Sequence, residues 1–154
     1  MTIEDDIAFL ERVPALRLLG RDALRILAIG TENRYIHEGI SLFGEGEDAD
    51  GAYVVQEGSF DLLSEKNSIP PSVAGPGTLI GELALLTETK RPVTAIAREP
   101  SSVVRIPRQL FLKMLEGYPD AAQRMRDAVA ARVNQTAGEF ARVRSVLTGG
   151  SARK

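Results

Sequence analysis

The chain has 154 residues, 44% of them hydrophobic and 26% charged, which is the composition of one globular domain and not of a disordered chain. Its 19 Lys and Arg residues against 21 Asp and Glu give a formal net charge of -2, so no global field draws the protein to nucleic acid or to acidic membranes. The absence of cysteine excludes disulfides, thiolate metal sites and thiol nucleophiles, and it favours a cytoplasmic location.

The N-terminal segment is acidic and lacks the basic start and apolar core of a signal peptide, and no later run has the length of a membrane span. We therefore expect neither secretion nor membrane insertion. Apolar residues at helical spacing predict two short helices, over residues 3–10 and 21–29. Pro14 and Gly30 punctuate their ends.

Residues 33–107 change to short runs rich in Val, Ile, Tyr and Phe, separated by glycines. The clearest predicted strands are residues 53–56, 60–64, 93–97 and 103–106. Residues 66–76 predict a loop because of their paired prolines and polar residues. The pattern indicates an α+β protein whose centre is an antiparallel β-barrel or jelly roll.

Helical periodicity returns over residues 108–147, interrupted at Tyr118-Pro119-Asp120. The last predicted helix has a seam of residues spaced alternately by three and four: Met125, Val129, Val133, Thr136, Phe140, Val143 and Leu147. Such a helix is long enough to pack on the barrel and on a second copy of the chain. We expect one domain over residues 1–147 and a flexible tail over residues 148–154.

One segment carries the chemistry: Gly75-Pro76-Gly77, followed by the run from Gly81 to Thr94. It is typical of a glycine turn, a short helical turn and a basic residue that enters a strand. Such a turn presents backbone N–H groups to an anion, and the Arg91 guanidinium has the two-pronged geometry that a phosphate accepts. Glu82, in the same turn, is able to accept hydrogen bonds from sugar hydroxyls.

This segment resembles the phosphate-binding cassette of the cyclic nucleotide-binding domains found in catabolite activator proteins, protein kinase A regulatory subunits and gated channels. Gly81 to Leu85 match the cassette, Arg91 follows Glu82 by nine positions as in the family, and Thr94 also matches. Upstream residues reproduce the family's spacing of barrel-turn glycines around an Asp and a Tyr: Gly39, Gly46, Asp50, Tyr53 and Gly58. The resemblance extends from about Ile7 to Val143.

The resemblance implies that the chain binds a cyclic nucleotide. Arg91 would contact the cyclic phosphate and Glu82 the ribose 2′-hydroxyl, and the cassette's other implied contacts are Gly81, Leu83, Ala84, Pro92, Val93 and Thr94. The family meets the base with its C-terminal helix, where Thr136 lies at the matching depth. Cyclic AMP is the expected ligand, because no additional hydroxyl after Arg91 favours cyclic GMP.

Pro92 departs from the family pattern, which has a small residue with an N–H directed at the phosphate in this place. Proline has no N–H to donate. One lost hydrogen bond to a charged group costs about 1.5–3 kcal/mol, or roughly tenfold or more in affinity. Val93 is also bulkier than the usual alanine, which narrows the floor of the pocket.

No catalytic or metal-binding constellation accompanies the cassette. The chain has no cysteine nucleophile, no GxSxG elbow, no Walker sequence and a single histidine, His37, which we expect at the surface. The acidic residues Glu45 and Glu47 fall in a predicted turn and are expected to be solvated. These patterns favour a protein that is not an enzyme and needs no cofactor or metal.

Two functions remain open. The first is a sensor in which the bound nucleotide shifts the C-terminal helix and so alters a homodimer or the docking of an effector protein. The second is a ligand-free interaction or dimerisation domain with a degenerate cassette, which Pro92 favours. The chain ends where catabolite activators carry their helix-turn-helix, so we expect no direct contact with DNA.

Overall fold

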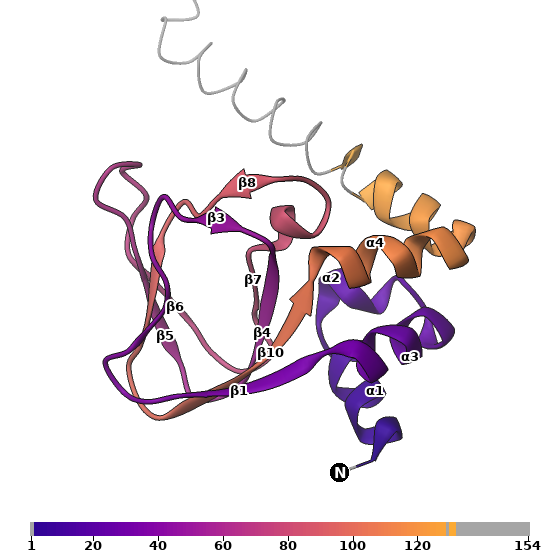
Figure 1. The fold of residues 1–154 in the computed structure, drawn as a ribbon, viewed down its shortest axis with the longest axis horizontal. Coiled ribbons are helices and arrows are strands. Elements are labelled where there is room, and N and C mark those ends of the chain that lie inside the picture. Colours follow the sequence, from indigo (N-terminus) through magenta and orange to yellow (C-terminus); the bar gives the residue numbers. More distant parts are fainter. Residues whose placement is uncertain (1, 129, 132–154) are drawn as a thin grey trace, which may run out of the picture.

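The computed structural model describes residues 2–128 and 130–131. Figure 1 shows two parts, a jelly roll of antiparallel strands and a group of helices gathered at one end of it. The predicted α+β class is confirmed, although the strands form separate sheets and not one closed barrel. None of the described helices is long and apolar enough to cross a membrane.

Three helices precede the sheets: α1 (Ile3–Glu11), α2 (Pro14–Arg17) and α3 (Arg21–Gly30). Thr2 caps α1 through a capping box, because its hydroxyl accepts the Asp5 N–H while the Asp5 carboxylate accepts the Thr2 N–H. α1 ends at Glu11, and Pro14 is the first residue of α2, where the fixed φ of proline suits the first helical position. The sequence analysis had missed this short helix.

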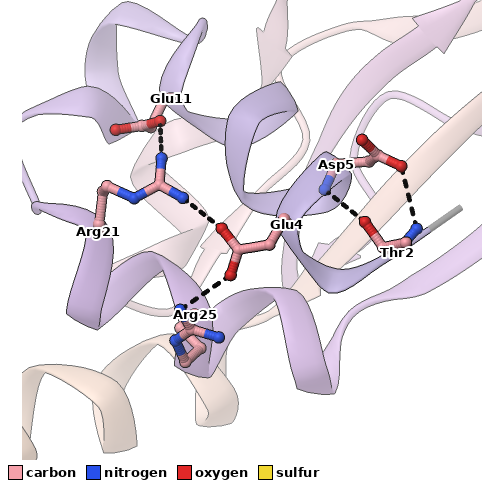
Figure 2. A network of polar contacts seen from close by, with 6 residues as sticks. All are labelled: Thr2, Glu4, Asp5, Glu11, Arg21 and Arg25. Atoms are coloured by element: carbon pink, nitrogen blue, oxygen red, sulfur yellow. Dashed lines mark hydrogen bonds and ion pairs between the residues drawn. The ribbon is translucent and has the colours of Figure 1, made fainter.

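Charged side chains join α1 to α3 on the outside of the helical group (Figure 2). Glu4 lies between two arginines of α3, 2.6 Å from Arg21 and 3.0 Å from Arg25, and Arg21 also contacts Glu11 at 2.6 Å. These side chains are largely exposed. The network therefore adds only modestly to the packing beneath it.

Two four-stranded antiparallel sheets, in the orders β1-β10-β4-β7 and β2-β9-β5-β6, and the pair β3-β8 form the jelly roll. The strands are β1 (Glu32–Ile36), β2 (Ser41–Phe43), β3 (Asp48–Ala49), β4 (Gly51–Glu57), β5 (Phe60–Leu63), β6 (Ser72–Ala74), β7 (Leu79–Ile80), β8 (Thr89–Lys90), β9 (Thr94–Ala97) and β10 (Ser101–Pro107). The four predicted strands are confirmed within a few residues. The predicted loop over 66–76 is wrong in part, because β6 lies inside it and pairs with β5.

After the sheets come α4 (Arg108–Gly117) and a helical segment over residues 119–128 and 130–131. Tyr118 separates them, as predicted. The Arg124 guanidinium donates to the carbonyls of Leu18 (2.6 Å) and Leu19 (3.0 Å), which ties the last described helix to the N-terminal helices. The predicted seam residues beyond Met125, Thr136 among them, lie outside the described residues.

The interior has two hydrophobic clusters. The helix-facing cluster lies between the helices and the sheet of β4 and β10, with Phe111, Leu24 and Ile106 fully buried in it. The cassette-facing cluster lies between the two larger sheets and includes Phe43, Tyr53, Phe60, Val93 and Val103. The predicted cassette contributes to both clusters: Val93 belongs to the cassette-facing cluster and Leu85 to the helix-facing cluster.

Candidate functional site

The cassette begins where β7 ends. Gly81 has a φ of +83°, in the left-handed region, and it caps the short 3-10 helix η1 (Glu82–Leu85). A Cβ on residue 81 would overlap Nη1 of Arg91. Glycine is therefore required here for two reasons, the backbone conformation and the close approach of the guanidinium.

Arg91 is the buried charge of the site. Only 3% of the residue is exposed, and it follows directly after β8. Its guanidinium carbon lies 4.3 Å from the centre of the Phe43 ring and 5.6 Å from that of Tyr53, so the charge rests on aromatic faces.

Two of the guanidinium nitrogens of Arg91, Nε and Nη1, are buried and have no hydrogen-bond partner within the described part of the chain. Burial lowers the pKa of Arg91 from its ordinary value, and Tyr53, Asp50 and Glu47 act in the opposite direction. A buried polar group normally has its hydrogen bonds satisfied. The arrangement therefore has donors in place for an acceptor that the described residues do not supply.

Main-chain hydrogen bonds fix where Arg91 stands. Its N–H donates to the Glu47 carbonyl and its own carbonyl accepts the Gly46 N–H, both at 2.8 Å. The turn between β2 and β3 therefore holds the backbone of the arginine, while Phe43 supports its side chain. The side chain has little freedom to leave the interior.

The other predicted contact residues surround this arginine in different environments. Ala84 is buried and its N–H donates to the Gly81 carbonyl at 3.0 Å, so that N–H is engaged within the turn. Glu82 is half-buried and Leu83 is 58% exposed. These two residues are the first two of η1.

Beyond Arg91, the next three residues alternate in exposure. Pro92 is exposed, Val93 is buried in the cassette-facing cluster, and Thr94 is half-buried. The Thr94 hydroxyl accepts the N–H of Glu45 at 2.8 Å, and the Pro92 carbonyl accepts from Asn67 at 2.9 Å.

Sequence reasoning missed Phe43, Glu45 and Asn67, and it was wrong about Glu45. The Glu45 carboxylate was expected to be solvated, but it is half-buried and accepts hydrogen bonds from the segment after β5. Hydrogen bonding to the Glu65 N–H is the main cause that lowers the pKa of Glu45. No local pattern reveals these contacts, because the partners lie about twenty residues apart.

An open pocket of about 740 Å³ adjoins the buried arginine. Its lining residues are Glu45, Gly46, Lys66, Asn67, Ile69, Thr89, Lys90, Arg91 and Pro92. The volume falls within the range of pockets that hold small organic ligands, about 300–1,000 Å³. The described residues contain no group of His, Cys, Asp and Glu side chains that would hold a metal ion.

The far side of η1 faces the helices. Leu85 is 1% exposed and belongs to the helix-facing cluster with Phe111 of α4 and Met125 of the last described helix. Arg108, the first residue of α4, donates through Nη1 to the carbonyls of Ala49 (2.8 Å), Ala84 (3.1 Å) and Thr87 (3.2 Å). The cassette is therefore joined to the C-terminal helices by packing and by hydrogen bonds.

Known proteins are similar to this chain in sequence and in fold. Over 127 residues the chain is 31% identical to lysophospholipase nte1 of Aspergillus oryzae, a match that covers 75% of this chain but only 8% of that protein. A solved cyclic nucleotide-binding-like protein from Brucella abortus is 37% identical, with a TM-score of 0.63 over 73% of this chain and 98% of the other. The N-terminal domain of a transcriptional regulator from Streptomyces coelicolor is 27% identical, with a TM-score of 0.77 over 86% of this chain and 94% of the other.

The family whose sequence model matches is described as the cyclic nucleotide-binding domain, and the match spans residues 33–118. That span holds the whole jelly roll after the first residue of β1, the cassette and α4. The fold is of a regulatory type, and the lysophospholipase relative is an enzyme of which this chain resembles only a small part. The chain belongs to the cyclic nucleotide-binding domain family.

Proposed function

We propose that this chain binds a cyclic nucleotide, cyclic AMP in preference to cyclic GMP, and acts as a regulatory sensor. The observation that carries the proposal is the Arg91 guanidinium, 3% exposed and with Nε and Nη1 lacking hydrogen-bond partners in the described structure. A cyclic phosphate has one negative charge and oxygens that accept from such a fork.

The burial of Arg91 favours a role in ligand binding over a purely structural role. A buried charge is costly unless it is paired, whereas a structural arginine normally has its nitrogens bonded to carboxylates or carbonyls. Arg108 shows the structural case in this chain, since it satisfies three carbonyls. Arg91 instead rests on aromatic rings, and a bound anion would compensate its charge in surroundings of low dielectric.

The remaining contacts follow the family resemblance. Glu82 would accept from the ribose 2′-hydroxyl, and the backbone of Leu83, the second residue of η1, would contact the phosphate. Ala84 would need to exchange its bond to the Gly81 carbonyl for one to the ligand. Thr136, beyond the described residues, is the proposed contact of the base.

The proposed output is through the C-terminal helices. A ligand that draws η1 toward Arg91 would move Leu85, which packs with Phe111 and Met125. The shifted helix would then alter a homodimer or the docking of an effector protein in the cytoplasm, without catalysis by this domain and without direct contact with DNA.

A second candidate function is a ligand-free interaction domain. Pro92 favours it, because the residue after Arg91 has no N–H for a phosphate. In that case the buried arginine would remain uncompensated and the cassette would serve only to hold η1 against the helices.

Calorimetric titration with cyclic AMP tests the two candidates, with cyclic GMP and AMP as competing ligands. We expect saturable binding of cyclic AMP, weaker binding of cyclic GMP, and a loss of at least about 100-fold in affinity for Arg91→Met, because the variant removes two charge-assisted donors. Arg98→Met is the matched control, since Arg98 is exposed and pairs with Asp61 on the same sheet. Absence of heat from the wild type at millimolar cyclic AMP would favour the ligand-free candidate.

A further inference from the structure

A second feature beside the cassette is the segment between β5 and β6, which the Glu45 carboxylate holds in place. One carboxylate oxygen accepts the Glu65 N–H at 2.8 Å, and the other accepts the Lys66 N–H at 3.1 Å. The Ser64 hydroxyl (3.2 Å) and the Asn67 side-chain amide (3.0 Å) donate to the same second oxygen. A single ionised acceptor therefore organises four consecutive residues.

The same network reaches the cassette at two points. The N–H of Glu45 donates to the Thr94 hydroxyl at 2.8 Å, and the amide nitrogen of Asn67 donates to the Pro92 carbonyl at 2.9 Å. Pro92 and Thr94 are the residues that follow Arg91 on either side of Val93. Asn67 thus bridges the Glu45 carboxylate and the carbonyl of Pro92, the residue directly after the buried arginine.

The conformation of the segment is one that it would not adopt without support. Ser68 has a φ of +55° and is the only non-glycine residue of the described chain with a positive φ. Serine is disfavoured in this left-handed region, so surrounding contacts must hold it there. The bonds from residues 64–67 to Glu45 hold the four residues directly before Ser68.

The segment also forms part of the pocket beside Arg91. Lys66, Asn67 and Ile69 line that pocket from one side, and Thr89 to Pro92 line it from the other. A shift of residues 64–69 would therefore change the shape of the pocket and release the Pro92 carbonyl at the same time.

We infer that Glu45 and Asn67 are positioning residues of the nucleotide site, which hold residues 64–69 as a wall of the pocket and fix the peptide group of Pro92. This inference rests on the proposed function, because the pocket shares Arg91 and Pro92 with the proposed nucleotide contacts. It assigns to Glu45 and Asn67 an indirect role, through the wall and the backbone, and no contact with the ligand. The lowered pKa of Glu45 agrees with a carboxylate that is held ionised by its donors.

The experiment compares Glu45→Gln, Asn67→Ala and the double variant with the wild type, using cyclic AMP calorimetry and amide hydrogen exchange without ligand. Gln keeps the shape of Glu45 but replaces one of its two acceptor oxygens with an NH₂ donor, so it opposes the N–H of residue 65 or of residue 66 and bonds the other more weakly, without the charge. We expect Glu45→Gln to speed exchange at those two amides by at least about tenfold, and to weaken cyclic AMP binding about tenfold. Asn67→Ala should weaken binding severalfold and leave exchange at residues 65 and 66 within about twofold of the wild type.

Because the two residues act through one network, the double variant should lose little more affinity than Glu45→Gln alone. Glu38→Gln is the matched control, because it removes the same charge at an exposed side chain outside residues 64–69 and outside the proposed contacts, and it should leave both readouts unchanged. A positioning role also predicts that the melting temperature shifts little while the affinity falls.

Unchanged exchange in Glu45→Gln, or wild-type affinity in both single variants, would overturn the inference. Failure of the proposed function gives a different result: the wild type itself would show no binding. Faster exchange at residues 65 and 66 would still support Glu45 as the residue that holds the segment, and unchanged exchange would overturn that role as well.

Discussion

The two hydrophobic clusters of this small domain differ in what their interiors contain. The helix-facing cluster consists of aliphatic residues, Phe111 and methionines, all packed against one another. The cassette-facing cluster has Phe43 and Tyr53 stacked beside the guanidinium of Arg91. Both regions are buried, but only the second contains a charge with nitrogens that lack a partner among the described residues.

The two clusters therefore differ in role: the helix-facing cluster stabilises the fold, and the cassette-facing cluster contains the arginine that we propose binds the ligand. Close packing of apolar side chains lowers the free energy of the folded state, and the helix-facing cluster serves that purpose. A buried guanidinium whose Nε and Nη1 lack hydrogen-bond partners in the part of the chain that the structure describes raises it, and the proposed binding of an anion would offset that cost. Substitutions in the helix-facing cluster, at Arg91 and on the surface test this contrast.

Truncation in the helix-facing cluster should have the largest effect. Phe111 is fully buried between α4 and its neighbours, so Phe111→Ala is expected to lower the free energy of unfolding by about 3–5 kcal/mol. Chemical denaturation followed by circular dichroism measures the change. The neighbouring Leu112 is 38% exposed, and Leu112→Ala should cost less than about 1.5 kcal/mol. Equal costs at the two positions would contradict the assignment of the core.

Removal of the buried charge should instead increase the free energy of unfolding. Without nucleotide, Arg91→Met is expected to raise the free energy of unfolding by about 1 kcal/mol, because it replaces an uncompensated guanidinium with an apolar side chain of similar length. The same denaturation experiment measures it, with Arg98→Met as the exposed control. A loss of more than about 1 kcal/mol would show that Arg91 serves the folded state, as an arginine with structural partners does.

The charged network on the surface should have the smallest effect. Glu4 bridges Arg21 and Arg25 (Figure 2), but all three side chains are about half exposed, so Glu4→Gln should cost less than about 1 kcal/mol at low salt. The cost should shrink further at high salt, because ions screen exposed pairs. Denaturation at two salt concentrations measures this, with the exposed Glu116→Gln as control. A cost that persists at high salt would mean that the network is part of the core.

Features that depend on runs of neighbouring residues were predicted correctly from the sequence. The centres of β4 and β10 were predicted because each is a short run rich in β-branched residues, bounded by turn residues. In the structure, β10 pairs along most of β4. The cassette was predicted because its glycine, acid and arginine lie within eleven residues, from Gly81 to Arg91. The short elements β3, β6 and β8 were not, since two or three residues give too little periodicity and are fixed by their pairing partners.

The family, the centres of the longer strands and the position of Arg91 in the cassette could be predicted from the sequence alone, because each depends on residues close together in the chain. Only the tertiary structure decided that Phe43 and Tyr53 support the arginine, that Glu45 organises residues 64–67, and that Arg108 joins α4 to η1. These contacts connect segments that are far apart in the chain, and residue types alone do not reveal which segments meet. Local preference fixes an element, whereas the packing of sheets and helices fixes which buried polar groups find a hydrogen-bond partner.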